Sequence, residues 1–250
     1  MMVAPTVVFD LDGTLVDTAP DLVAMLNTIF SREGLPPVAF DAARNMVGRG
    51  ARAMIERGLA AQAGQARLAH DRAKPGQARV SMGRTLVAAD IDRLVRDFID
   101  HYAAHIADRS RPFPGLEPAL DELAAGGCRF AVCTNKLEWL SVRLLDALDL
   151  SRRFVAICGA DTFGMQKPDP ELLRRTIAQA GGHADRAIMV GDSINDIATA
   201  RAAGIPVVAV DFGYTETPVG ELGPDRVISA LADLPNAVFG LLGGGGAHAP

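Results

Sequence analysis

Acidic side chains cluster at two points of this sequence where a buried strand is expected to end. Asp10 and Asp12 follow the apolar run at residues 3–9, and Asp192 follows the run at 187–190, with Asp196 one helical turn later. In open α/β sheets ligands bind beyond the carboxyl ends of the strands, so we expect these carboxylates to converge. Carboxylates near one point repel unless a cation lies among them, and hard oxygen ligands suit Mg²⁺. The sequence therefore predicts a magnesium site.

A hydroxyl group, an amide and an ammonium are expected at the same edge. Thr134 and Asn135 follow the apolar run at 128–133, and Lys167 lies in the loop before a helix predicted at 170–180. Lys167 is one of three lysines in a chain whose other basic residues are arginines. An ammonium and a hydroxyl beside a metal ion would neutralise a bound anion, which is typical of phosphoryl transfer.

Asp10 and Asp12 are suited to two different roles in that chemistry. A carboxylate such as Asp10 can attack phosphorus and form an aspartyl-phosphate. A second carboxyl group, Asp12, can protonate the leaving oxygen and later deprotonate water. Leu11 between them points to the opposite side of an extended chain, so Asp10 and Asp12 can share one orientation.

The elements that must position these residues alternate along the second half of the chain. After residue 111, helices and short apolar strands follow one another, which is typical of βαβ units and a parallel sheet covered by helices. We expect strands at 3–9, 128–133, 154–158, 187–190 and 206–210, and helices at 116–125, 137–148, 170–180, 194–203 and 229–240.

Residues 18–110 interrupt this pattern and are predicted to be helical. Thr18 is expected to cap a first helix, Asp41 a short second one, and helices are expected at 51–61 and from residue 89. The stretch 62–84 fits either a long loop or a weak helix. The predicted organisation is a sheet domain of residues 1–17 plus 111–242, a helical insertion of residues 18–110, and a disordered tail at 243–250.

Composition and charge exclude several classes of protein. Hydrophobic residues make up 49% of the 250 residues and charged residues 22%, which is typical of a globular chain. The net charge of −5 argues against a nucleic-acid surface, and no apolar stretch is long enough to span a membrane. The N-terminus lacks the features of a signal peptide, and three cysteines fit a reducing compartment. We therefore expect a cytoplasmic protein, either a monomer or a homodimer.

Four ordered motifs carry a resemblance to a known family. DLDGTLVDT, CTNK, QKPDP and GDSIND resemble the motifs of the haloacid dehalogenase superfamily. The segments FDLDGTLVDTAPDL, FPGLEPALDEL and MVGDSINDI are most similar to its phosphoglycolate phosphatases. The resemblance implies an α/β fold with a Rossmann-like parallel-sheet core, an inserted all-helical cap domain, and a Mg²⁺-dependent phosphatase acting on a small phosphorylated substrate.

The same resemblance implies a role for each residue of the site. Asp10 would be the nucleophile and Asp12 the general acid and base. Thr134 and Lys167 would bind the phosphoryl oxygens, and we include Asn135 among the substrate-binding residues. The resemblance further implies that Mg²⁺ is bound by Asp10, the backbone carbonyl of Asp12, and Asp192, while Asp196 orients a metal-bound water or Lys167.

Three other features have weaker functional interpretations. Gly48-Arg49-Gly50 does not follow a strand, so a dinucleotide site is not expected there; Arg49 either contacts a substrate carboxylate or belongs to a surface loop. His101 and His105 have the spacing of metal ligands on a helix, but no acidic motif accompanies them, and we expect exposed or half-buried histidines. Cys133 has no histidine partner and is expected in the core.

Several functions remain open at this point. The leading hypothesis is hydrolysis of 2-phosphoglycolate to glycolate and phosphate. The alternatives are a phosphatase for another small sugar- or acid-phosphate, a phosphoglucomutase-like phosphoryl transferase, and a non-catalytic phospho-ligand binding protein. A dehalogenase would not need Asp12, and a P-type ATPase would need membrane spans.

Overall fold

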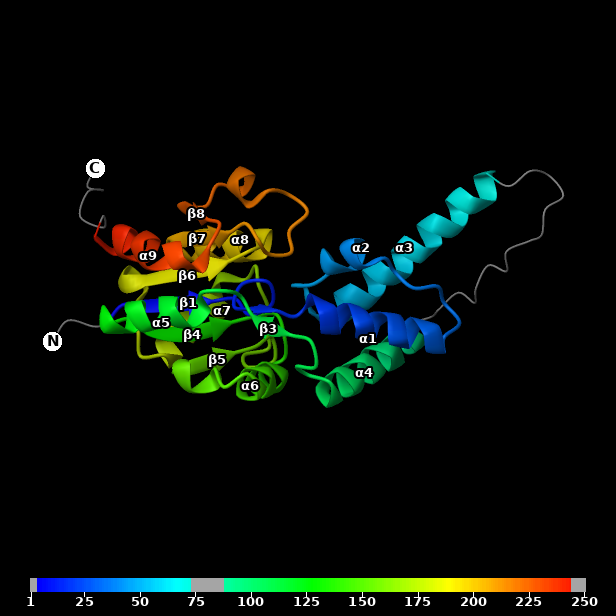
Figure 1. Ribbon diagram of the computed structural model, residues 1–250, viewed down its shortest axis with the longest axis horizontal. Coiled ribbons are helices and arrows are strands. Elements are labelled where there is room, and N and C mark those ends of the chain that lie inside the picture. Colours follow the sequence, from blue (N-terminus) through cyan, green and yellow to red (C-terminus); the bar gives the residue numbers. More distant parts are fainter. Residues whose placement is uncertain (1–3, 73–87, 244–250) are drawn as a thin grey trace.

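The computed structural model describes residues 4–72 and 88–243 of the chain. A sheet with its flanking helices forms one part, and helices α1–α4 extend from one end of it (Figure 1). The helices are α1 (Ala19–Arg32), α2 (Phe40–Arg44), α3 (Gly50–Arg72), α4 (Ala88–Ala104), α5 (Leu116–Ala125), α6 (Glu138–Ala147), α7 (Pro170–Gln179), α8 (Ile194–Ala203) and α9 (Leu234–Gly243).

Six parallel strands form the central sheet, in the order β5-β4-β1-β6-β7-β8. They are β1 (Thr6–Phe9), β4 (Arg129–Cys133), β5 (Ala156–Cys158), β6 (Ala187–Gly191), β7 (Val207–Val210) and β8 (Arg226–Ile228). Because β1 is central, with β4 on one side and β6 on the other, the segments that follow these three strands emerge next to one another. The predicted α/β class and the parallel-sheet core are confirmed.

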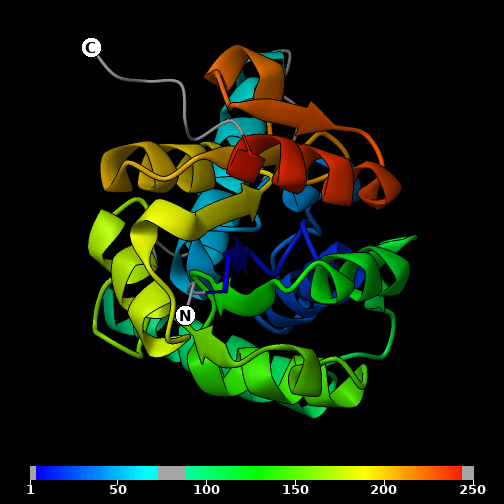
Figure 2. The ribbon, with the colours of Figure 1, turned by 90° about the vertical axis from the view of Figure 1, so that its left-hand side faces the viewer.

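Helices cover both faces of the sheet (Figure 2). α7 packs on β4 and β5, and α8 on β6 and β7. On the other face α9 packs on β7 and β8, and α5 packs on α9. Side chains along β1 alternate between these two layers: Val8 belongs to the cluster under α7 and α8, and Val7 and Phe9 belong to the opposite cluster. Burial on both faces explains why the apolar residues Val7, Val8 and Phe9 follow one another in this strand without a polar alternation.

Helices α1–α4 pack mainly on one another, with α4 against α1 and α3. Helix α3 continues to Arg72, so the helix expected at 51–61 is longer than predicted and passes through Gly64. A glycine inside a helix costs about 1 kcal/mol and does not by itself end one. The rest of the stretch at 62–84 lies outside the described residues. So does the expected tail at 243–250, except for Gly243, which ends helix α9 and is not part of a disordered tail.

The chain crosses between the two parts at a small antiparallel pair that the sequence did not predict. Strand β2 (Val16–Asp17) pairs with β3 (Arg111–Pro112), with Val16 opposite Pro112. The outgoing and returning chains therefore lie side by side. The predicted domain boundaries, after residues 17 and 110, fall beside this pair and remain a proposal.

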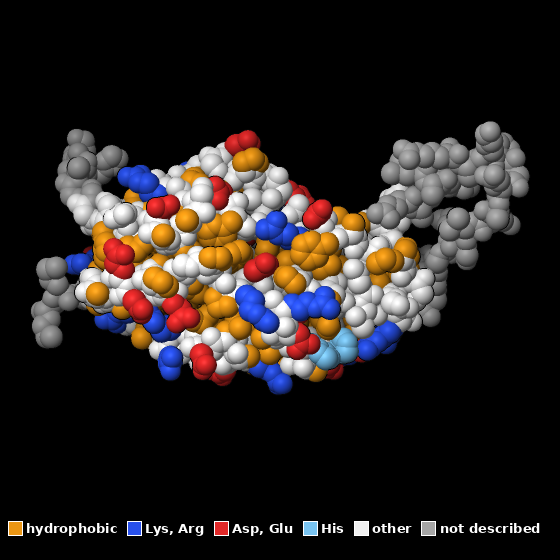
Figure 3. Space-filling view, in the orientation of Figure 1, with side chains coloured by type: hydrophobic (Ala, Val, Ile, Leu, Met, Phe, Trp, Pro, Cys, Tyr) orange, Lys and Arg blue, Asp and Glu red, His pale blue; other side chains and the backbone are white. Residues whose placement is uncertain are grey.

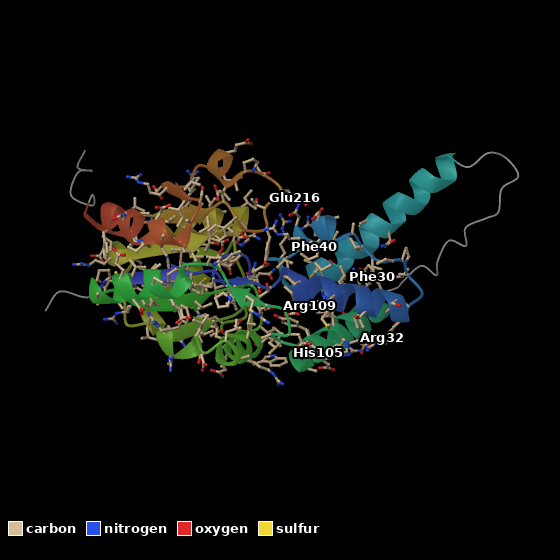
Figure 4. All side chains as sticks on the ribbon, in the orientation of Figure 1. Phe30, Arg32, Phe40, His105, Arg109 and Glu216 are labelled. Atoms are coloured by element: carbon tan, nitrogen blue, oxygen red, sulfur yellow. The ribbon has the colours of Figure 1, made fainter. Side chains whose placement is uncertain are left out.

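Asp21, in the first turn of α1, joins the two crossing chains. Its carboxylate accepts hydrogen bonds from the backbone N–H groups of Arg109 and Ser110, at 3.0 and 2.7 Å, and from the Ser110 hydroxyl at 2.6 Å. Asp21 is 2% exposed. Figure 4 labels Arg109 at this junction. Three donors on one buried carboxylate fix the start of α1 against the return of the chain.

Replacing Asp21 with Ala should therefore lower the free energy of unfolding by about 3 kcal/mol, because buried donors lose their acceptor. Urea unfolding measures the change. Asp41→Ala, which removes an exposed carboxylate from the first turn of α2, is the matched control and should change it by less than about 0.5 kcal/mol. Equal effects of the two substitutions would contradict the role of Asp21.

One of the two predicted helix caps is confirmed in position, and the other is wrong. Thr18 is the N-cap residue of α1, but its side chain makes no capping hydrogen bond; its hydroxyl donates to Asp12 instead. Asp41 lies inside α2, whose N-cap is Ala39. Ser193 is the N-cap of α8.

The surface mixes charges of both signs. On the face drawn in Figure 3, acidic, basic and hydrophobic side chains are interspersed. Within the described residues, every helix is too short or too polar to cross a bilayer.

Candidate active site

Asp10 is the first residue after β1 and is held at the carboxyl edge of the sheet. Its N–H donates to the carbonyl of Val190 on neighbouring β6, at 2.9 Å. Its carboxylate oxygen Oδ1 lies 2.8 Å from the Nζ of Lys167, and both side chains are almost fully buried. Asp10 is thus a buried carboxylate with an ammonium group against it.

Lys167 lies between two carboxylates. Besides Asp10, its Nζ donates to Oδ1 of Asp196 at 2.6 Å. The other oxygen of Asp196 accepts from the N–H and the hydroxyl of Ser193, at 3.0 and 2.6 Å. Burial opposes the charged form of Lys167, but the two carboxylates outweigh it and raise its pKa above the ordinary value. Lys167 is therefore a permanent cation in the site.

Asp192 follows β6, and only neutral groups donate to it among the described residues. Thr14 Oγ1 donates to its Oδ1 at 3.2 Å, and the N–H of Tyr214 to its Oδ2 at 2.6 Å. The loop after β7 approaches it closely: a Cβ on Gly213 would lie 2.2 Å from the Cβ of Asp192. Glycine at this position lets the backbone reach the carboxylate.

Three carboxylates form a compact acidic cluster. One oxygen each from Asp10, Asp192 and Asp196 lies within 4.8 Å of the other two. Burial, together with neighbouring carboxylates, raises the pKa of Asp10 to about 7 and that of Asp192 well above its ordinary value, although Lys167 opposes both shifts. Among the described residues Lys167 is the ammonium that contacts this cluster, so negative charge is in excess. Such an oxygen-only donor set suits a hard divalent cation.

Thr134 and Asn135 follow β4 and are buried. The hydroxyl oxygen of Thr134 accepts from the N–H of Lys136 at 3.2 Å, so its proton is free to donate to another group. The Asn135 side chain binds the backbone of Lys167: its Oδ1 accepts from the N–H at 2.7 Å, and its Nδ2 donates to the carbonyl at 3.2 Å. Asn135 therefore holds Lys167 in position; that it contacts substrate stays a prediction.

Asp12 faces a different set of partners. Its Oδ1 accepts from the Thr18 hydroxyl at 2.7 Å and lies 3.0 Å from Lys136 Nζ. Lys136 Nζ in turn donates to the hydroxyl of Tyr102 on α4, at 3.3 Å. We did not predict these partners of Asp12; the scarcity of lysine in the chain was the available signal for Lys136.

A cavity separates the end of the sheet from the helices. Its volume is about 240 Å³, and it is lined by Asp12, Thr134 and Lys136 from the sheet side and by Met54, Phe98 and Tyr102 from the helices. Arg49 lines both this cavity and a neighbouring one that reaches Lys167. Arg49 is exposed, so its guanidinium is accessible to a substrate.

The loop after β7 also contacts the helices. Arg44 of α2 donates to the carbonyls of Phe212 and Gly213, at 2.9 and 3.1 Å, and Arg57 of α3 pairs with Glu216. Figure 4 labels Glu216 where this loop approaches the helices. Since the next residue, Tyr214, donates to Asp192, the loop connects the helical part to the acidic cluster.

Most of the predicted site residues meet at the sheet edge. Asp10, Lys167, Asp192 and Asp196 are in contact or nearly so, and Thr134, Asn135 and Asp12 lie around them. The interpretations of Cys133, His101 and His105 agree with the structure. Cys133 is buried, which raises the pKa of its thiol to about 12, and the two histidines are half-buried with their rings 5.0 Å apart.

The chain is similar to proteins of a known hydrolase family. Residues 7–210 match the family model described as haloacid dehalogenase-like hydrolase. A phosphoglycolate phosphatase of Caulobacter vibrioides is 49% identical over 237 residues, which are 95% of this chain and 92% of that protein. Another, of Agrobacterium fabrum, is 46% identical, with 98% of this chain and 97% of that protein covered.

Solved structures have the same fold. A predicted phosphoglycolate phosphatase from Haemophilus somnus has a TM-score of 0.80 and 26% identity, covering 95% of this chain and 99% of that one. These similarities confirm both the family and the phosphatase class that the motifs predict. The chain therefore belongs to the haloacid dehalogenase-like hydrolase family.

Proposed function

We propose that this protein hydrolyses 2-phosphoglycolate to glycolate and phosphate through an aspartyl-phosphate on Asp10. The observation that carries the proposal is the buried pair of Asp10 and Lys167, beside the carboxylates of Asp192 and Asp196. The named activity of relatives 46% and 49% identical to the chain supports the choice of substrate.

In the first step a carboxylate oxygen of Asp10 attacks phosphorus. A bond forms between that oxygen and phosphorus, the bond from phosphorus to the glycolate oxygen breaks, and Asp12 gives its proton to the leaving oxygen. In the second step water attacks the same phosphorus and gives a proton to Asp12. Phosphate leaves and the Asp10 carboxylate is regenerated.

Lys167 and Thr134 are suited to bind the phosphoryl group. The ammonium of Lys167 already lies 2.8 Å from the attacking carboxylate, so it can offset negative charge on both reacting groups. The hydroxyl of Thr134 has a free proton and lines the cavity. Both side chains are held by their surroundings and need little reorganisation.

The acidic cluster fits Mg²⁺. Of the three buried carboxylates, Asp10 and Asp196 contact the Lys167 ammonium, whereas Asp192 accepts only from the Thr14 hydroxyl and the N–H of Tyr214 among the described residues. One oxygen from each of the three lies within 4.8 Å of the other two, and these oxygens are hard donors. Asp10, Asp192 and the backbone carbonyl of Asp12 would hold the ion. Asp196, whose two oxygens bind Lys167 and Ser193, would orient Lys167. When bound, Mg²⁺ would neutralise charge on the phosphoryl oxygens.

Arg49 is our candidate for the substrate carboxylate. It is exposed and lines the two cavities that reach Asp12 and Lys167. A guanidinium can bind a carboxylate through two parallel hydrogen bonds. The selection of an acidic leaving group would then depend on the helical part of the molecule.

Phosphate release with Mg²⁺ tests the proposal. 2-Phosphoglycolate is compared with a panel of small sugar- and acid-phosphates, with the Asp10→Asn protein as the blank. A kcat/KM for 2-phosphoglycolate at least about tenfold above the other substrates would support both the chemistry and the substrate. Stronger activity on another monoester would reject the substrate and keep the chemistry, and no release from any of them would reject the function.

Removal of divalent cations should abolish this activity. EDTA is expected to stop phosphate release and Mg²⁺ to restore it, because the carboxylates otherwise repel the substrate phosphate. Ca²⁺ should inhibit, because its coordination shell is larger and less regular. Mg²⁺ should also raise the Tm of the protein without substrate, since it binds the folded state. Full turnover in EDTA would contradict the metal assignment.

A further inference from the structure

Lys136 is a buried cation to which the mechanism above gives no role. It follows β4 directly after Thr134 and Asn135, and it is 9% exposed. It lines the cavity between the sheet and the helices. A buried ammonium costs free energy unless its partners compensate it, so its contacts indicate what it does.

The contacts of Lys136 lead to one oxygen of Asp12. Oδ1 of Asp12 lies 3.0 Å from Lys136 Nζ and also accepts from the Thr18 hydroxyl at 2.7 Å. A positively charged donor and a hydroxyl therefore occupy Oδ1. Oδ2 has no such donor among the described residues, so it is the oxygen available to exchange a proton with a ligand.

Tyr102 of α4 holds the other side of the ammonium. Its hydroxyl accepts from Lys136 Nζ at 3.3 Å, and Nζ lies 4.6 Å from the centre of its ring. Tyr102 is 1% exposed, and burial raises its pKa to about 12, so it stays a neutral acceptor. Lys136 thus bridges a helix of the insertion and the carboxylate of Asp12.

We propose that Lys136, held by Tyr102, is a positioning residue that binds Oδ1 of Asp12 and leaves Oδ2 facing the leaving oxygen of the substrate. The inference rests on the proposed function, in which Asp12 protonates that oxygen. Without Lys136 the carboxyl group can rotate, because Thr18 alone would hold Oδ1. The proton would then be delivered less often to a leaving group that requires it.

Leaving groups of different basicity separate this role from a general structural one. Glycolate leaves as a basic alkoxide unless it is protonated, whereas 4-nitrophenolate leaves without a proton. Lys136→Met keeps the length and packing of the side chain and removes the charge. We expect it to lower kcat/KM for 2-phosphoglycolate about 100-fold, mainly through kcat, and that for 4-nitrophenyl phosphate less than about fivefold.

Tyr102→Phe tests the contact from α4. It removes the hydroxyl and keeps the ring under the ammonium, so we expect the same selective loss at a smaller size, about three- to tenfold. Lys136→Arg keeps the positive charge and should retain more activity than Lys136→Met, although the guanidinium group is larger than the ammonium group. If Lys136→Met does not fold, Thr18→Val removes the other donor to Oδ1 and should give the same selectivity, with Thr18→Ser as its matched control.

A double-mutant cycle checks that Lys136 acts through Asp12. In an Asp12→Asn protein, Lys136→Met should add less than about twofold to the loss on 2-phosphoglycolate, since the group it positions is already inactive. Additive losses would overturn the inference. Equal losses on 2-phosphoglycolate and 4-nitrophenyl phosphate would also overturn it.

Ethyl phosphate distinguishes recognition of the substrate carboxylate from positioning of Asp12. Its leaving group is basic but carries no carboxylate, so we expect Lys136→Met to lower its hydrolysis about as much as that of 2-phosphoglycolate. A loss confined to 2-phosphoglycolate would mean that Lys136 binds the carboxylate, and would overturn the inference while the proposed function stands. A native protein inactive on all three esters would instead reject the proposed function, and this inference with it.

Discussion

A protein in which Asp10 is replaced by Asn should release no phosphate above the background without protein, a loss of at least about 10⁴-fold. The amide cannot form the acyl phosphate, and the Lys167 ammonium that faces it loses its anionic partner. Phosphate release from 2-phosphoglycolate measures the loss. Mass spectrometry of acid-quenched native protein during turnover should find one added phosphoryl group on the peptide that carries Asp10, and none in the variant.

The Tm of the variant distinguishes a loss of catalytic activity from a loss of folding. Burial, together with the nearby Asp196 and Asp12 carboxylates, raises the pKa of Asp10 from 3.8 to about 7. A raised carboxyl pKa means that the folded state binds the proton more tightly, so the native protein loses stability as pH rises toward and through 7. Without Mg²⁺ at about pH 8, the Asp10→Asn protein should have a Tm no lower than that of the native protein.

Exposed Asp41 provides the matched control for the same chemical change. Asp41→Asn should leave turnover within about twofold of native, because it lies on the surface of α2. Clear residual activity of Asp10→Asn, in a preparation free of native enzyme, would refute the covalent mechanism.

Loss of the Lys167 charge should have the second largest effect. Lys167→Met is expected to lower kcat at least about 10²-fold, the size found when one preorganised donor is removed from a transition state. Its Nζ contacts Asp10 at 2.8 Å and Asp196 at 2.6 Å, so its removal also leaves the acidic cluster without this ammonium. Breaking a buried pair in this way costs about 3–5 kcal/mol of unfolding free energy.

Mg²⁺ should partly rescue the stability of the Lys167→Met protein. A divalent cation bound by Asp10 and Asp192 would replace the missing positive charge, so we expect Mg²⁺ to raise the Tm of the variant more than that of the native protein. Thermal unfolding with and without Mg²⁺ measures this. Lys167→Arg keeps the charge and is the control for it. Wild-type kcat in Lys167→Met would refute the assigned role.

The strands at the centre of the sheet could be predicted because both of their faces are buried. Apart from Thr6 and Arg129 at the first positions of β1 and β4, the strands β1, β4, β6 and β7 consist of apolar residues and glycine. Their parallel orientation followed from the helices between them. β8 was missed because Arg226 and Val227 are exposed and leave no apolar run. β2 and β3 were missed because each strand has only two residues, which are too few to show an alternation of apolar and polar side chains.

The acidic half of the site could be predicted because strand ends converge. Asp10 and Asp192 directly follow neighbouring strands, so strand order alone brings them together. The partners of Asp12 could not be found in this way. Tyr102 reaches Lys136 from a helix 34 residues away in sequence, and the side chain of Thr18 makes a contact that its position before a helix did not indicate. Such contacts depend on how the helices dock.

The two-residue β2–β3 pair would allow the helical segment between its strands to be replaced by a different insertion. Its outgoing and returning ends are already adjacent, with Asp17 opposite Arg111, so an insert of another length or shape needs only to begin and end at that spacing. The register of the six-stranded sheet, and with it the acidic cluster, would be unaffected by such a change. Evolution of this scaffold toward a new phosphate ester can therefore proceed by replacing helices while the reacting groups are inherited intact.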